Sequence, residues 1–108
     1  MGVNLRDGNI DRMGVVQVSI DVANVAANTT AEQTFTVTGL RVGDMVLVSK
    51  PSVSAGLGIV NARVSATDTL ALTFVNATGA GINPAAETYT IAWFRPTPGA
   101  TPPGAVLV

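Results

Sequence analysis

The sequence predicts a single small all-β domain, a jelly-roll-like sandwich or a barrel of about 6–8 short antiparallel strands with extended N- and C-terminal arms. Three observations predict this fold class. Apolar and polar residues alternate with a period of two in several short runs, turn-forming residues separate those runs, and no segment sustains a helical period. The 108 residues leave room for one hydrophobic core.

Composition divides the chain into three parts. Residues 1–14 are polar and hold four of the thirteen charged residues, which predicts an N-terminal arm. Residues 15–95 contain the alternating runs and are expected to form the β-sandwich domain. Residues 96–108 contain four of the six prolines. Because proline cannot donate a backbone hydrogen bond inside a sheet, this segment is expected to form an extended tail with an apolar end.

Three runs in the first half of the domain are expected to be strands. Residues 16–22 place valine or isoleucine at every second position, and residues 34–38 place two apolar side chains between three threonines. Residues 45–49 are almost continuously apolar and follow a glycine-containing turn. Residues 50–58 contain a proline and two glycines, which predicts a surface loop.

Two further alternating runs, residues 60–65 and 70–75, are predicted to form a hairpin. A two-residue turn would set apolar residues against polar ones, so a three-residue loop over residues 66–68 is expected, with Asp68 in the left-handed conformation. This loop places three pairs opposite each other: Val64 and Leu70, Ala62 and Leu72, Val60 and Phe74. The last strand is expected over residues 88–95.

The composition also limits the classes of partner. Charged residues make up only 12% of the chain, against about 25% in an ordinary soluble domain, and apolar residues make up 47%. We expect a surface of neutral polar residues, part of it covered by another subunit. The six basic residues are scattered singly, so no nucleic-acid partner is expected. No apolar run approaches the ~20 residues of a membrane-spanning helix, so neither a membrane partner nor a secretory leader is expected.

Catalytic and metal-binding residues are not recognisable in the sequence. The chain has no histidine and no cysteine, so an enzyme, a cofactor or a small-molecule substrate is not expected. Residues 7–11 resemble the start of a calcium loop, but Arg12 and Val18 stand where the turn glycine and the last glutamate are needed. Tyr89 and Trp93 share one strand face and are expected in the core; an exposed carbohydrate platform is the alternative.

Apolar residues in the two arms are the candidate partner-interface residues. They are Leu5 and Ile10 in the N-terminal arm, and Val106, Leu107 and Val108 at the end of the tail. Apolar residues at chain ends are poor candidates for the core. They are expected either to dock on a neighbouring subunit or to remain without fixed structure.

Three segments carry a resemblance to a known family. They are residues 39–48 (GLRVGDMVLV), residues 64–76 (VSATDTLALTFVN) and residues 87–91 (ETYTI). A Gly-Asp pair precedes a strand, a Thr-rich hairpin ends in Asn, and the last strand follows. In this order and spacing, the chain from about residue 37 to residue 96 resembles the small capsid decoration proteins of tailed phages, also called cement or head-stabilisation proteins.

The resemblance implies a jelly-roll-like domain that forms a homo-oligomer, with a trimer favoured and a dimer possible. It implies a structural protein of the virion that binds the outer surface of an icosahedral head. There it bridges major capsid proteins and stabilises the shell against the pressure of packaged DNA. The hypothesis for the arms is that one of them reaches across to the capsid or to a sister subunit.

Two other functions remain open at this stage. One is a receptor- or glycan-binding module of a phage fibre, which would display Trp93. The other is a hydrolase that uses only carboxylates, which would need two acidic side chains within about 5–10 Å of each other in a cleft.

Overall fold

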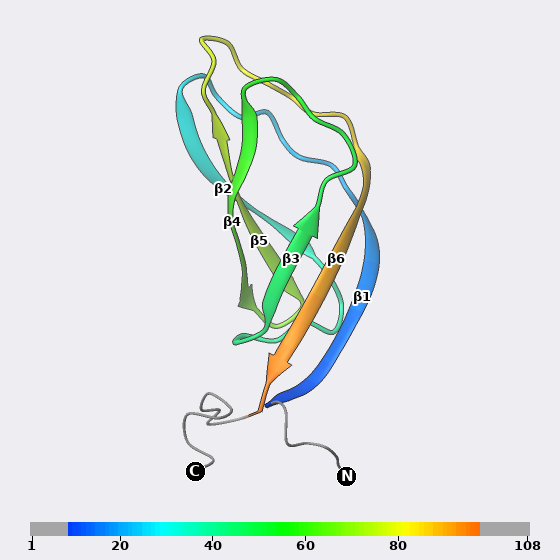
Figure 1. Cartoon of the computed structure of the whole chain (residues 1–108). Coiled ribbons are helices and arrows are strands. Elements are labelled where there is room, and N and C mark those ends of the chain that lie inside the picture. The colour runs from blue at the N-terminus through cyan, green and yellow to red at the C-terminus, as the bar shows by residue number, and fades with distance from the viewer. Residues whose placement is uncertain (1–8, 98–108) are drawn as a thin grey trace.

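The computed structural model describes residues 9–97, which form six β-strands (Figure 1). In chain order the strands are β1 (Ile10–Ile20), β2 (Thr29–Thr36), β3 (Met45–Ser49), β4 (Leu57–Ala66), β5 (Thr69–Asn76) and β6 (Glu87–Pro96). The all-β prediction is confirmed. Across residues 9–97 we find no helix with the length and hydropathy that would carry it through a bilayer.

The strands form two three-stranded antiparallel sheets. One has the order β1-β6-β3 and the other the order β2-β5-β4. The first strand therefore pairs with the last, and the second pairs with the fifth. β3 and β4, which follow each other in the chain, lie in different sheets and contact each other. The arrangement fits a small β-sandwich.

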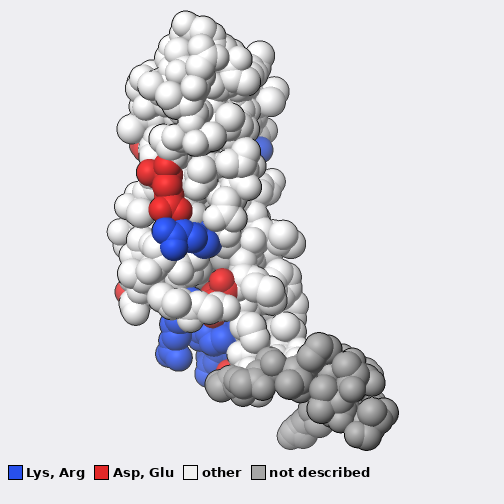
Figure 2. Space-filling view, turned by 90° about the vertical axis from the view of Figure 1, so that its left-hand side faces the viewer, with Lys and Arg blue, Asp and Glu red and all other residues white. Residues whose placement is uncertain are grey.

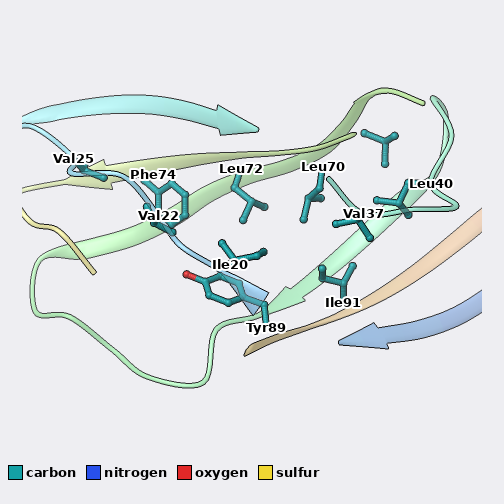
Figure 3. Packing of buried hydrophobic residues seen from close by; sticks show 11 residues of the cluster. Ile20, Val22, Val25, Val37, Leu40, Leu70, Leu72, Phe74, Tyr89 and Ile91 are labelled. Carbon is teal, nitrogen blue, oxygen red and sulfur yellow. The ribbon is translucent and has the colours of Figure 1, made fainter. Parts of the chain in front are cut away.

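The hydrophobic core lies between the inward faces of the two sheets (Figure 3). β5 contributes Leu70, Leu72 and Phe74, and β6 contributes Tyr89 and Ile91, all of them without solvent exposure. The cluster also contains Ile20, Val22, Val25, Val37, Leu40 and Val64. Most of these side chains are the inward half of the alternation seen in the sequence, whereas Val25 and Leu40 come from the connections between strands.

Two of the three aromatic residues of β6, Tyr89 and Trp93, lie on its inward face, as predicted. Tyr89 is fully buried, and Trp93 packs against the buried cluster. Burial raises the pKa of the Tyr89 phenol to about 12, and the nearby Glu87 carboxylate adds to the rise. Gly14 of β1 makes room for Trp93, because a Cβ at this position would lie 3.0 Å from the indole Nε1.

The N-terminal boundary of the domain differs from the prediction. β1 begins at Ile10, so the arm predicted over residues 1–14 does not extend beyond residue 9. Residues 10–14 pair with the end of β6, with Ile10 opposite Pro96. Sheet pairing satisfies backbone groups whatever the local side chains are, so a polar, glycine-containing segment can still be a strand. Pro96, the first residue of the predicted tail, is the last residue of β6.

The β4–β5 hairpin has a two-residue turn, with Ala66 opposite Thr69, so the predicted three-residue loop over residues 66–68 is wrong. A register shift between Val64 and Ala66 nevertheless keeps apolar side chains of the two strands on the same face, as predicted. Val64 lies opposite Leu70 and Ala62 opposite Leu72, although Ile59 rather than Val60 lies opposite Phe74 because the register shifts there. Asp68 has a φ of 60°, the left-handed conformation predicted for it. Its carboxylate Oδ1 also accepts a 2.7 Å hydrogen bond from the backbone N–H of Gly39. The tip of the hairpin is thereby tied to the turn that follows β2.

Asn76, the last residue of β5, ties two long connections together. Its side-chain amide donates hydrogen bonds to the carbonyl oxygens of Val25 (3.0 Å) and Ala80 (2.8 Å). Its Oδ1 accepts from the backbone N–H of Thr78 (2.9 Å) and from the Thr78 hydroxyl (2.7 Å). The side chain is fully buried, so these bonds replace water for both of its polar atoms.

We expect Asn76→Ala to lower the free energy of unfolding by about 2–3 kcal/mol, since it leaves buried backbone groups with fewer partners. Urea denaturation followed by tryptophan fluorescence measures the change. Asn61→Ala, at an exposed position of β4, is the control and should change stability by less than about 0.5 kcal/mol. Equal effects of the two substitutions would contradict a structural role for Asn76.

Candidate protein-contact surface

The outer face of the β1-β6-β3 sheet is the candidate functional site. Residues directly opposite each other in adjacent strands point to the same side of a sheet. The pairing register therefore sets the outward residues in rows across the three strands. The rows are Met13, Phe94 and Met45; then Val15, Ala92 and Leu47; then Gln17, Thr90 and Ser49.

The first two rows are apolar and open to solvent. We call their six residues the apolar rows. Met13 is 65% exposed and Val15 69% exposed on β1, while Met45 is 52% and Leu47 66% exposed on β3. Phe94 and Ala92 lie between them on the central strand and are half-buried. Exposed apolar residues are ordinary when single, but a contiguous group of this kind marks a contact surface.

Charge is missing from this part of the face. From Met13 to the end of β1, the outward residues of the three described strands are apolar, Ser, Thr or Gln. The third row is polar but neutral, and Gln17 Nε2 donates a 3.3 Å hydrogen bond to the Thr90 hydroxyl. A surface without charge can be covered by another protein without burying an unpaired charge.

The outer face of the other sheet has a different character. There Glu32 of β2 and Arg63 of β4 form an ion pair with an N···O distance of 2.8 Å. Figure 2 looks onto the side where β2 and β4 lie in Figure 1, and shows acidic and basic groups next to each other on it. Threonines occupy many of the neighbouring outward positions: Thr30, Thr34, Thr36, Thr69 and Thr73. This face is typical of a solvated surface.

An ion pair on the inward side fixes the turn that begins β3. The Asp44 carboxylate accepts hydrogen bonds from Arg95 Nε (2.8 Å) and Nη2 (2.9 Å), and from the backbone N–H of Arg41 (2.9 Å). Arg95 Nη2 also donates to the carbonyl of Gly39 (2.9 Å), and its guanidinium lies 5.1 Å from the centre of the Trp93 ring. These contacts hold Met45 in line with β6 and keep both charges off the outer face.

The same contacts predict a pH dependence of stability. The Arg95 hydrogen bonds lower the pKa of Asp44 against the opposing effect of burial. Since the pKa is lower in the folded protein than in the unfolded chain, the stabilisation is complete above the unfolded value of about 4. It is lost as the pH falls through the folded value.

We therefore expect the free energy of unfolding to fall as the pH is lowered below about 4, and to fall less for Asp44→Asn. At neutral pH this variant should be less stable by about 1–3 kcal/mol. Thermal unfolding at several pH values between 2 and 7 measures both effects. Glu32→Gln, which removes an exposed ion pair, is the control and should change neutral-pH stability by less than about 1 kcal/mol. Parallel pH profiles for native protein and Asp44→Asn would contradict the assignment.

No known protein family, curated protein or solved structure matches this chain.

Of the residues predicted from the sequence as a partner interface, one belongs to the described part. Ile10 is 42% exposed and opens β1 next to the apolar rows. Leu5, Val106, Leu107 and Val108 lie outside residues 9–97. The sequence does not predict the apolar rows, because its composition places Met13 in an arm. One pattern in the sequence does indicate an exposed apolar face. Met45–Ser49 carries apolar residues on both of its faces, and a domain this small cannot bury both.

A second surface feature is a pocket of about 450 Å³ beside the loop that follows β3. Val48, Leu57, Ile59 and Phe74 are among its lining residues, together with Lys50. The Lys50 ammonium lies 2.7 Å from the Glu87 carboxylate, which also accepts a hydrogen bond from the Ser52 hydroxyl. These bonds lower the pKa of Glu87, that from Lys50 most strongly. Lys50 and Glu87 thus neutralise each other rather than facing a ligand.

The described part of the chain covers residues 9–97. In that range no three His, Cys, Asp or Glu side chains come close enough together to hold an ion. The acidic cluster considered above, residues 7–11, lies partly outside the described range.

Proposed function

We propose that the chain is a capsid decoration protein, a structural component on the outer surface of an icosahedral phage head. It binds the major capsid protein and bridges neighbouring capsid subunits, which stabilises the shell. It also binds itself, and the resemblance favours a homotrimer over a dimer. The proposal involves no catalysis, nucleic acid, membrane or small-molecule substrate.

The single observation that carries this proposal is the uncharged apolar face of the β1-β6-β3 sheet. A protein whose role is to lie against other proteins needs a surface that can lose its water without leaving charged groups buried and unpaired. Met13, Val15, Met45 and Leu47 provide it, each more than half exposed. Many copies on one lattice need only modest affinity per copy, because linked contacts raise the effective concentration and can multiply avidity by about 10²–10⁴.

The strand order supports the finer expectation of a jelly roll. β1 pairs with β6 and β2 with β5, so the chain folds back on itself like a long hairpin that is rolled into two sheets. Jelly rolls usually have eight strands, and six such strands make a shortened version. The proposed arms, with Leu5 and the Val106–Val108 segment, lie outside the described residues and belong to the proposal.

The position of the aromatic residues favours this function over a glycan-binding module of a fibre. A glycan platform would display Tyr89 and Trp93 to solvent. In this chain Tyr89 is fully buried and Trp93 packs on the core.

Binding to heads tests the proposal. Heads assembled without this chain, from the virus whose genome encodes it, are mixed with the purified protein and pelleted. Mass spectrometry then gives the ratio of the chain to the major capsid protein. We expect saturable binding at a fixed ratio and a higher temperature of head disruption. Recovery of all the protein in the supernatant, or binding of a few copies at one vertex, would contradict the proposal.

A further inference from the structure

Four strands form the edges of the two sheets, and an exposed edge is a template for pairing with another chain unless it is protected. Three of these edges carry such protection. β3 has only five residues and lies against β4. β4 carries Arg63 and two register shifts, one between Ile59 and Asn61 and one between Val64 and Ala66. Short strands, charges and bulges are the usual means of blocking edge pairing.

β2, the third edge, is protected in a different way. It carries the charged residue Glu32 at its centre. The side chain of Gln33 also holds the preceding connection close to the strand. Its Oε1 accepts a 2.8 Å hydrogen bond from the Ala23 N–H, and its Nε2 donates a 3.0 Å bond to the Ala23 carbonyl.

The edge of β1 has none of these features over most of its length. β1 is the longest strand, with 11 residues, and its charges and single register shift are confined to its first residues, up to Arg12. From Met13 to Ile20 the sequence is MGVVQVSI, without charge or proline. The whole chain has a formal net charge of only −1, so two copies repel each other little.

We infer that the free edge of β1 pairs with β1 of a second copy of this chain. The contact is an antiparallel two-fold pairing that joins two three-stranded sheets into one of six strands, in the order β3-β6-β1-β1-β6-β3. Each copy presents the same unprotected edge, and a contact between identical surfaces closes as a dimer. This inference rests on the self-association included in the proposed function. It selects the dimer, which the resemblance gives as possible, instead of the favoured trimer, and it names the surface that makes the contact.

The alternation of side chains between the two faces of a strand restricts the register of this pairing. Opposed residues in antiparallel strands share a face, so the outward residues of one copy must face outward residues of the other. In β1 these are Met13, Val15, Gln17 and Ser19. Any allowed register therefore continues the uncharged outer face from one copy into the next. The dimer presents two sets of apolar rows on the same side of one sheet.

Sedimentation equilibrium of the purified full chain, without any capsid, tests the inference. The native chain should dimerise with increasing concentration. Gln17 lies near the middle of the uncharged stretch 13–20, so Gln17→Lys places a positive charge from each copy in the contact and should weaken dimerisation at least 10-fold. Ser49→Lys is the matched control, since it puts the same charge in the same row of the face but on β3, at the opposite edge. It should leave dimerisation unchanged within 2-fold.

Amide hydrogen exchange of the native chain provides a second readout. Those amides of residues 13–20 that point to the free edge, and not to β6, should exchange more slowly in concentrated than in dilute samples. A monomer at every concentration, a trimer as the associated state, or equal effects of the two lysine variants would overturn the inference. Because no capsid is present, loss of head binding in the earlier experiment would leave a dimer observed here intact, so the two proposals fail separately.

Discussion

Replacing Val15 and Leu47 together by lysine is expected to lower the affinity of the chain for phage heads by about 100-fold or more. Both side chains lie in the second of the apolar rows, on either side of Ala92. If another protein covers this row, each lysine must bury an ammonium group without a partner or force the surfaces apart. Pelleting with heads over a range of protein concentrations measures the loss.

The double variant should fold as well as the native chain. Val15 is 69% and Leu47 66% exposed, so neither contributes much to the core. Exposed substitutions of this kind change stability by about 0.5 kcal/mol or less each. Thr34→Lys, on the outer face of the other sheet, is the control and should bind heads like the native chain. Head binding by the double variant at native affinity would contradict the role of the apolar rows.

The largest expected loss of stability comes from Phe74→Ala in β5. Phe74 is fully buried among the core residues of both sheets (Figure 3). Removing its ring leaves a cavity, and substitutions of this type cost about 3–5 kcal/mol. A domain of this size has about 5–15 kcal/mol in total, so the variant should be close to unfolding at 37 °C.

Chemical denaturation of Phe74→Ala and of a surface control measures this loss. Val53→Ala is suitable, since Val53 is 88% exposed in the loop after β3. It should shift the free energy of unfolding by less than about 0.5 kcal/mol. A loss below about 1 kcal/mol for Phe74→Ala would mean that the two sheets do not share the core described above.

Most of the strands could be located from the sequence because the alternation of apolar and polar residues reports burial directly, although the predicted runs 16–22 and 34–38 overlap β1 and β2 only in part. Residues 45–49 match β3 without any shift. Asp68 has the predicted left-handed conformation, although the hairpin turn has two residues rather than three. The pairing of β1 with β6 could not be predicted in this way. Period-two patterns show which side of a strand is buried, but they do not identify the neighbouring strand.

The same limit explains why the candidate surface was missed. Met13 and Val15 come from one end of the domain, Met45 and Leu47 from its middle, and only β6 brings them together. The Asp44–Arg95 ion pair, which fixes the start of β3, joins residues 51 positions apart. Local composition also does not indicate that the first residues of β1 form a strand. Their strand conformation depends on hydrogen bonds to β6 rather than on their own side chains.

Oxidation of Met13 and Met45 tests most directly whether another protein covers the apolar rows. Both thioethers lie in the first row, and both residues are more than half exposed in the single chain. Exposed methionines are converted to sulfoxides by mild oxidants at rates that follow their accessibility. The free protein and the head-bound protein are oxidised in parallel and compared by peptide mass spectrometry. We predict that both residues oxidise in the free protein and are protected at least several-fold on heads. Equal oxidation rates in the free and bound forms would show that this face stays open and would contradict the account.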